Sequence, residues 1–266
     1  MKAAMDRFAI YQTDAMLAAI ERDGYAFISE ALPRESCAEA CAKMDALEPR
    51  HWDETHGAGA PGSGRFLDRY LCVFERDPYW LGFLDRPGII DLVEAALGRD
   101  CHVIGETAWR SHPGFRGEPL HVDYLPLTWP EGALPEAVRV PAFVLTAHFY
   151  LNDVTADLAP TRVVPGSHRA GRAPRPDEER WSGRAPEVVL ACAGDALVFR
   201  SEMWHAGSDN TSERGARHLL QVHYGRREVA QHCPAFSDRC FPPAVLGGAS
   251  RRQRRLLGDH DPGAYD

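Results

Sequence analysis

A histidine and an aspartate stand two positions apart near the middle of the chain, as His121-Val122-Asp123. On a strand, residues i and i+2 point to the same face, so the imidazole and the carboxylate would emerge side by side. On a helix the two side chains would diverge by about 200°. Adjacent nitrogen and oxygen donors suit a borderline divalent metal and supply two corners of a facial triad. Such a pair is also common by chance, so a metal site requires a third ligand.

The stretch 194–205 offers that ligand, because it reads as a turn, a strand and then His205 at the far end. Downstream, residues 210–217 lead into a further expected strand at 218–224, and Arg217 stands immediately before its first residue. An arginine in that position could hold a carboxylate through two parallel hydrogen bonds, as a keto-acid cosubstrate would require. The residues alone therefore point to a metal centre with an anion site beside it.

Four motifs resemble the phytanoyl-CoA dioxygenase family of non-haem Fe(II), 2-oxoglutarate-dependent oxygenases in order and spacing. They are HVD at 121–123, VVPGSHR at 163–169, AGDALVF at 193–199 and WHAGSDNTS at 204–212. The resemblance spans about residues 20–228 and implies a double-stranded β-helix, a jelly-roll or cupin-like fold. It further implies that His121, Asp123 and His205 are the catalytic iron ligands, with Arg217 holding 2-oxoglutarate and O2 as the oxidant.

The cosubstrate site leaves alternatives open. The family places its arginine one residue nearer to the distal histidine than Arg217 lies here, which indicates a one-residue insertion in the turn and keeps Arg214 as a second candidate. The hydroxyl groups of Ser208 and Thr161 are further candidates for contact with 2-oxoglutarate. Halogenating relatives carry alanine or glycine at the position of Asp123, so the carboxylate favours hydroxylation over halogenation.

Five residues are candidates for lining the substrate pocket: Arg110, Tyr124, His148, Tyr150 and Trp204. Thr146, His148 and Tyr150 occupy every second position of one expected strand and so share a face. We expect this face to point inward. The alternative interpretations are an outward polar face for this strand, an edge charge for Arg110 and core packing for the aromatic residues. We expect His168, in the PGSH turn, to be structural.

The elements that position these residues predict an α+β chain with a mainly β core. The first hundred residues read mainly as helices at 14–22, 33–47 and 87–98, with a strand at 24–29 and a glycine-rich loop at 52–64. Short strands follow at 102–109, 119–124, 142–151, 161–164, 187–191, 196–200 and 218–224. We predict one domain over 1–266, with a helical part over about 1–100, a β-helix core over about 101–228 and an irregular tail over 229–266.

Composition and charge limit the kinds of molecule that the protein is expected to bind. The chain has 30 basic and 38 acidic side chains and a formal net charge of −8, without a long basic run, which argues against nucleic-acid binding. No apolar stretch approaches the roughly 20 residues that span a bilayer, and charged residues interrupt the N-terminus where a signal peptide would be apolar. The 7 cysteines are scattered without a CxxC pair, as in a cytoplasmic protein with reduced thiols. We expect a small-molecule substrate and a monomer or homodimer.

The predicted function is oxidation, by hydroxylation, of a C–H bond of a small molecule, with succinate and CO2 as co-products. Two alternatives use the same residues. One is a non-catalytic β-barrel that binds metal or ligand, and the other is a cupin-like isomerase or hydrolase that uses zinc or nickel.

Overall fold

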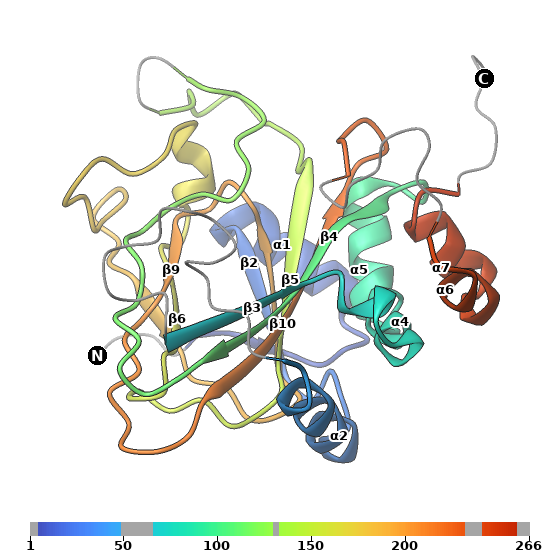
Figure 1. Ribbon diagram of the computed structural model, residues 1–266. Helices are drawn as coiled ribbons and strands as arrows, with labels where there is room; N and C mark the ends of the chain where they lie inside the picture. Colours follow the sequence, from blue (N-terminus) through green and yellow to red (C-terminus); the bar gives the residue numbers. More distant parts are fainter. Residues whose placement is uncertain (1–4, 49–65, 130–132, 232–240, 260–266) are drawn as a thin grey trace.

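Two β-sheets form the body of the double-stranded β-helix, which the computed structural model describes over residues 5–48, 66–129, 133–231 and 241–259 (Figure 1). The major sheet has the strand order β1-β2-β8-β5-β10-β4-β3, and the small sheet has the order β7-β6-β9. The major strands are β1 (Arg7–Phe8), β2 (Tyr25–Ile28), β3 (Leu67–Leu71), β4 (His102–Ser111), β5 (Val144–Tyr150), β8 (Ala196–Arg200) and β10 (Arg217–Gly225). The small sheet contains β6 (Thr161–Val163), β7 (Glu187–Val189) and β9 (His205–Gly207).

Helices pack against one face of the major sheet. They are α1 (Thr13–Asp23), α2 (Arg34–Asp45), α4 (Leu81–Leu84), α5 (Ile89–Leu97), α6 (Pro243–Gly248) and α7 (Arg251–Leu256), with 3-10 turns η2 (Val73–Glu75) and η3 (Pro78–Trp80). A further 3-10 turn, η4 (Ser167–Ala170), follows β6, and its Ala170 packs with Val164 and Trp204 instead. In Figure 1, α4 to α7 lie to the right of the major sheet, and β6 and β9 lie to its left. Among the described residues, no helix is long and apolar enough to cross a membrane.

Side-chain alternation along the strands separates the helix-covered face from the face that holds the site. On β5, Leu145, Ala147 and Phe149 belong to the core beneath the helices, and the ring of Phe149 lies 5.8 Å from that of Phe83 in α4. His148 and Tyr150 point the other way, toward the small sheet. The expected inward face of this strand is therefore the observed one.

The first helix ends at Gly24 for a steric reason. Gly24 has φ of 90°, and a Cβ there would lie 2.7 Å from Nδ1 of His168. Only glycine adopts such a conformation without strain, so the chain can turn directly from α1 into β2. His168 lies buried in η4 outside the cavity of the site, in agreement with the structural interpretation of the PGSH turn.

Three expected elements differ from the structure. Residues 119–124 do not form a strand but make one isolated bridge, between His121 and His205, in a segment with prolines at 119 and 126 that cannot donate to a ladder. The N-terminal part is less helical than predicted, because β1 and β3 join the predicted strand β2 in the major sheet. The tail holds α6 and α7, and Arg252 of α7 pairs with Glu94 of α5 at 2.5 Å. The glycine-rich loop predicted at 52–64 lies outside the described residues.

Candidate metal centre

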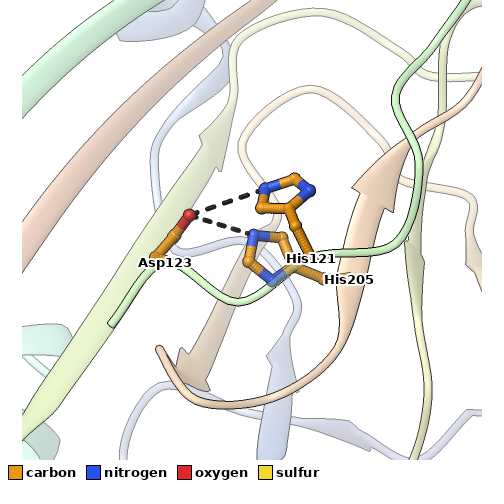
Figure 2. Close-up of side chains that lie close together, drawn as sticks. All are labelled: His121, Asp123 and His205. Atoms are coloured by element: carbon orange, nitrogen blue, oxygen red, sulfur yellow. Dashed lines mark ion pairs between the residues drawn. The ribbon is translucent and has the colours of Figure 1, made fainter. Parts of the chain in front are cut away.

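His121, Asp123 and His205 converge on one point, with one potential ligand atom from each lying within 4.8 Å of the others. Oδ1 of Asp123 lies 3.6 Å from Nε2 of His121 and 3.5 Å from Nε2 of His205, and Figure 2 shows the carboxylate facing both rings. Within the described part of the chain, this is the one group of three such side chains placed to hold a metal ion.

Backbone hydrogen bonds hold the ligand-bearing segments together. The N–H of His121 donates to the carbonyl of His205 at 2.9 Å, and the N–H of His205 donates back at 3.0 Å. Two residues on, the N–H of Asp123 donates to the carbonyl of Ser201 at 2.9 Å. The extended segment therefore places His121 and Asp123 on the same side, as the i, i+2 spacing predicts.

Each imidazole is oriented through its other nitrogen. Nδ1 of His121 lies 3.0 Å from the carbonyl of Pro119, and Nδ1 of His205 lies 2.9 Å from the carbonyl of Met203. A carbonyl only accepts, so Nδ1 carries the proton in both rings and Nε2 keeps its lone pair for a metal. Such hydrogen bonds fix the ring orientation and make the ligand more basic.

The electrostatics favour a cation between these groups. Burial disfavours the ionised form of Asp123, but the neighbouring His205 and His121 outweigh it and hold the pKa of Asp123 well below its usual value. Desolvation lowers the pKa of His121, but Asp123 and then Glu118 overcome this and raise it to about 9. In the metal-free protein His121 is therefore protonated at Nε2, and its positive charge neutralises the Asp123 carboxylate. A bound metal ion would take over this role.

A cavity of about 170 Å³ opens beside the three ligands and is lined by strands of both sheets. Four further candidate residues were predicted near the metal or the cosubstrate, and the structure separates them. Arg217 and Thr161 line the cavity, whereas Arg214 and Ser208 do not. Arg214 is exposed in the turn before β10, and Gly215 beside it has φ of 98°, so the longer turn carries Arg214 away from the site.

Arg217 lies buried at the start of β10 with part of its hydrogen-bonding capacity unused. Its guanidinium donates to the carbonyl of Ala159 and to Oγ of Ser111 at 3.2 Å, while its Nε–H has no partner. Burial lowers the pKa of Arg217 from its ordinary value, although Tyr150 and Glu118 oppose this shift. Nearby, the Tyr150 hydroxyl donates to Oγ1 of Thr161 at 3.0 Å. A buried cation with an unpaired N–H is suited to binding a carboxylate.

Of the five candidates for the substrate pocket, His148 lines the cavity and the other four do not. Arg110 lies on the opposite face of β4 from Trp109, where it binds Asp68 at 2.8 Å and Asp45 of α2 at 3.2 Å. The prediction for Arg110 is therefore corrected. An arginine on this face meets acidic partners beneath the helices instead of a ligand.

The three aromatic candidates have packing roles. Tyr124 packs against a small cluster that includes Ile104 and Val144. Tyr150 supports Thr161 from behind the cavity wall. The indole of Trp204 is fully buried and donates to the carbonyl of Arg172 at 2.9 Å. Tyr150 and Trp204 are buried in the core, as the alternative interpretation had it, whereas Tyr124 is partly buried at the edge of its cluster.

Seven polar or aromatic residues in the cavity wall escaped prediction: Arg69, Thr107, Trp109, Phe115, Glu118, Gln221 and His223. Gln221 and His223 could have been found, because they share the parity of Arg217 along the strand. Arg69 gave no such signal, since β3 was not predicted as a strand.

The family model for phytanoyl-CoA dioxygenase matches residues 20–219, most of the chain. The protein belongs to the phytanoyl-CoA dioxygenase family. Enzymes of this family use Fe(II), 2-oxoglutarate and O2, and the donor set of two imidazoles and one carboxylate agrees with that usage.

Other proteins are similar to this phytanoyl-CoA dioxygenase family member in sequence or in fold. An uncharacterised protein of Mycobacterium tuberculosis is 27% identical over 242 residues, which cover 88% of this chain and 82% of that protein. The epimerase SnoN of nogalamycin biosynthesis, described as α-ketoglutarate-dependent, superposes with a TM-score of 0.63 at 19% identity, over 81% of this chain and 83% of SnoN. HygX of Streptomyces hygroscopicus, solved with nickel and 2-oxoglutarate, superposes with a TM-score of 0.63 at 16% identity, over 82% of this chain and 88% of HygX. These two likenesses concern the fold.

Proposed function

We propose that this protein is an Fe(II)- and 2-oxoglutarate-dependent dioxygenase that hydroxylates a C–H bond of a small molecule. The observation that carries the proposal is the placement of a two-histidine, one-carboxylate triad and a buried arginine in the wall of one cavity. The donors fit Fe(II), because His121, Asp123 and His205 supply two imidazole nitrogens and one carboxylate oxygen. Arg217 fits a dicarboxylate cosubstrate through its unpaired Nε–H.

The residues of the chain divide the work between them. Nε2 of His121, Nε2 of His205 and Oδ1 of Asp123 would hold the metal, with both rings already turned by their Nδ1 hydrogen bonds. Arg217 would bind and orient the distal carboxylate of 2-oxoglutarate. When bound, the metal, 2-oxoglutarate and O2 would together supply an oxidant for the C–H bond: one oxygen atom of O2 would enter the succinate formed as 2-oxoglutarate loses CO2, and the other would go to the substrate.

The cavity wall would complete the site by positioning the substrate. Trp109, Phe115 and Leu219 provide apolar surface, while Arg69 and Glu118 add charged groups. A wall of this composition holds a polar small molecule in a fixed orientation and limits the access of bulk water. The retained carboxylate of Asp123 favours hydroxylation over halogenation.

A second outcome has support from the fold alone. SnoN shares this architecture and is an epimerase, so removal of hydrogen from carbon without oxygen transfer is the alternative chemistry for the same site. The non-catalytic binding protein is the third possibility, and it would bind 2-oxoglutarate without consuming it.

Succinate release tests the proposal. The Fe(II)-loaded wild type should convert 2-oxoglutarate to succinate in air, and His121→Ala and His205→Ala should abolish this conversion. His112→Ala is a matched control, because His112 lies outside the cavity and pairs with Asp68 at 2.8 Å. Turnover that survives in either ligand variant would disprove the assignment, and binding without any turnover would favour the non-catalytic protein.

A further inference from the structure

Three side chains form a hydrogen-bonded line across the neighbouring strands β4, β10 and β5. Nε1 of Trp109 lies 2.6 Å from Oε1 of Gln221, and Nε2 of Gln221 lies 2.7 Å from Nε2 of His148. Gln221 and His148 face each other directly in the register of β10 and β5. All three residues line the cavity that holds the metal ligands.

The chemistry of these groups fixes the direction of every hydrogen bond. An indole N–H only donates, so the atom of Gln221 that faces Trp109 must be the carbonyl oxygen. The amide nitrogen of Gln221 then faces His148 and donates to Nε2. An imidazole that accepts at Nε2 carries its proton at Nδ1, so His148 is the neutral Nδ1–H tautomer. Burial, and then His205, hold the pKa of His148 well below its ordinary value, in agreement with a neutral ring.

The proton on Nδ1 of His148 has no acceptor. The side chain is buried, with a relative exposure of 3%, and Nδ1 makes no hydrogen bond within the structure. Nε of Arg217 is a second donor without a partner in the wall of the same cavity. Buried donors are normally paired, so two unpaired ones in one cavity indicate a ligand rich in acceptor oxygens and poor in donors. A carboxylate has this chemistry.

The position of His148 places this donor beside the metal ligands. Its ring centroid lies 6.5 Å from that of His205 and 4.8 Å from that of Phe199, whose ring centroid lies 4.7 Å from that of His205. Arg217 also lies close enough to lower the pKa of His148, so both donors serve one compartment. His148 and Arg217 thus line the same cavity as the three metal ligands.

We infer that His148 binds the cosubstrate, its Nδ1–H donating to a carboxylate oxygen of 2-oxoglutarate, while Gln221 and Trp109 are positioning residues that hold the required tautomer. The inference rests on the proposed function and adds a second cosubstrate contact to that of Arg217. It also explains why a glutamine, with one donor end and one acceptor end, stands between an indole and an imidazole.

The test measures the affinity of the Ni(II)-loaded protein for 2-oxoglutarate by calorimetry, so that no turnover is needed. His148→Phe keeps the ring but removes the donor, and its Kd should rise about tenfold or more, as expected for loss of a hydrogen bond to a charged group. His148→Asn returns an N–H near the Nδ1 position and should stay within about threefold of the wild type. Gln221→Leu leaves His148 in place but frees its tautomer, and should raise Kd by about threefold.

Two controls separate binding from damage to the fold. His168→Phe alters another buried histidine whose Nδ1 has no partner, but one that lies outside the cavity, and it should leave Kd unchanged. The Ni(II) affinity of all four variants should stay within about twofold of the wild type, because no ligand is touched. Thermal unfolding verifies that each variant is folded at the temperature of the titration.

Unchanged 2-oxoglutarate affinity in a folded His148→Phe variant would overturn the inference alone. A wild type that binds Ni(II) but not 2-oxoglutarate would overturn the proposed function and this inference with it.

Discussion

His121 and His205 are paired twice, once through the backbone and once through their side chains. Their backbone N–H and carbonyl groups exchange hydrogen bonds of 2.9 and 3.0 Å, and their ring centroids lie 4.4 Å apart. Residues far apart in the sequence are thereby fixed at a distance set by the fold. The metal site is therefore formed before a metal binds. The conformational entropy of the ligand side chains is lost during folding and does not weaken metal binding.

Replacing Asp123 by asparagine should weaken metal binding strongly. The substitution keeps the shape of the side chain but removes the negative charge that lies 3.6 and 3.5 Å from the two Nε2 atoms. We expect at least about a hundredfold loss of Fe(II) or Ni(II) affinity, measured by anaerobic titration. Asp157→Asn, at an acidic residue outside the cavity, is the control; an equal loss there would show that the charge acts at long range.

The metal-free protein should lose stability as the pH rises through about 9. The pKa of His121 is raised from 6.5 to about 9 in the folded protein, so its protonated form is favoured by folding. That contribution is fully present below about pH 6.5 and disappears as pH rises through the folded value. Thermal unfolding in a chelator, from pH 6 to 10, should show the decline in the wild type and a smaller one in Asp123→Asn. A flat wild-type profile would contradict the His121–Asp123 pairing.

Metal affinity should have the opposite pH dependence. A metal ion must displace the proton from Nε2 of His121, so the apparent affinity should rise by up to about tenfold per pH unit and level off near pH 9. Titrations with Ni(II) at several pH values would measure this slope. An affinity independent of pH between 6 and 9 would mean that His121 is already neutral in the metal-free protein.

Arg110→Ala should damage the fold without touching the site. Arg110 is buried and holds Asp68 at 2.8 Å, and removing one partner of a buried pair leaves the other charge uncompensated. We expect a loss of about 3 kcal/mol in the free energy of unfolding, moderated by His112, which also pairs with Asp68 at 2.8 Å. In the remaining folded protein, the Kd for 2-oxoglutarate should be unchanged. A selective loss of 2-oxoglutarate binding would instead support the original prediction that Arg110 lines the pocket.

Gly24→Ala should destabilise the protein by more than about 1 kcal/mol, because alanine is strained at φ of 90° and its Cβ would meet His168 at 2.7 Å. Gly82→Ala in α4 is the matched control, since nothing lies within 4 Å of a Cβ there. That variant should be neutral or more stable by about 0.5 kcal/mol. Equal effects in chemical denaturation would contradict the packing of η4 against the end of α1.

The sequence predicts those helices and strands whose side-chain pattern is periodic over a short stretch. The helices around 13–23, 34–45 and 89–97 and most strands follow from side-chain periodicity and from glycine and proline positions. The ligand set follows from the i, i+2 spacing of His121 and Asp123 together with ordered motifs. Arg217 and Arg214 could not be separated, since only the three-dimensional course of the turn shows which one enters the cavity.

The cavity wall was harder to predict for a physical reason. Both faces of β4 are almost fully buried, so polarity does not reveal which face lines the site. The prediction placed Arg110 in the pocket, whereas its neighbour Trp109 occupies the wall. The partners of Arg110 come from α2 and β3, and contacts between elements so distant in sequence leave no local pattern to read.

In the proposed function, Arg217 anchors 2-oxoglutarate at a metal held by His121, Asp123 and His205. Anaerobic titration of the Fe(II) protein with 2-oxoglutarate tests it most directly, through the weak visible charge-transfer band of the chelate. The band should form in the wild type and in Arg214→Met, and it should be lost in Arg217→Met at the same ligand concentration. A band that survives in Arg217→Met, or a wild type that binds Fe(II) and never forms the band, would contradict the claim.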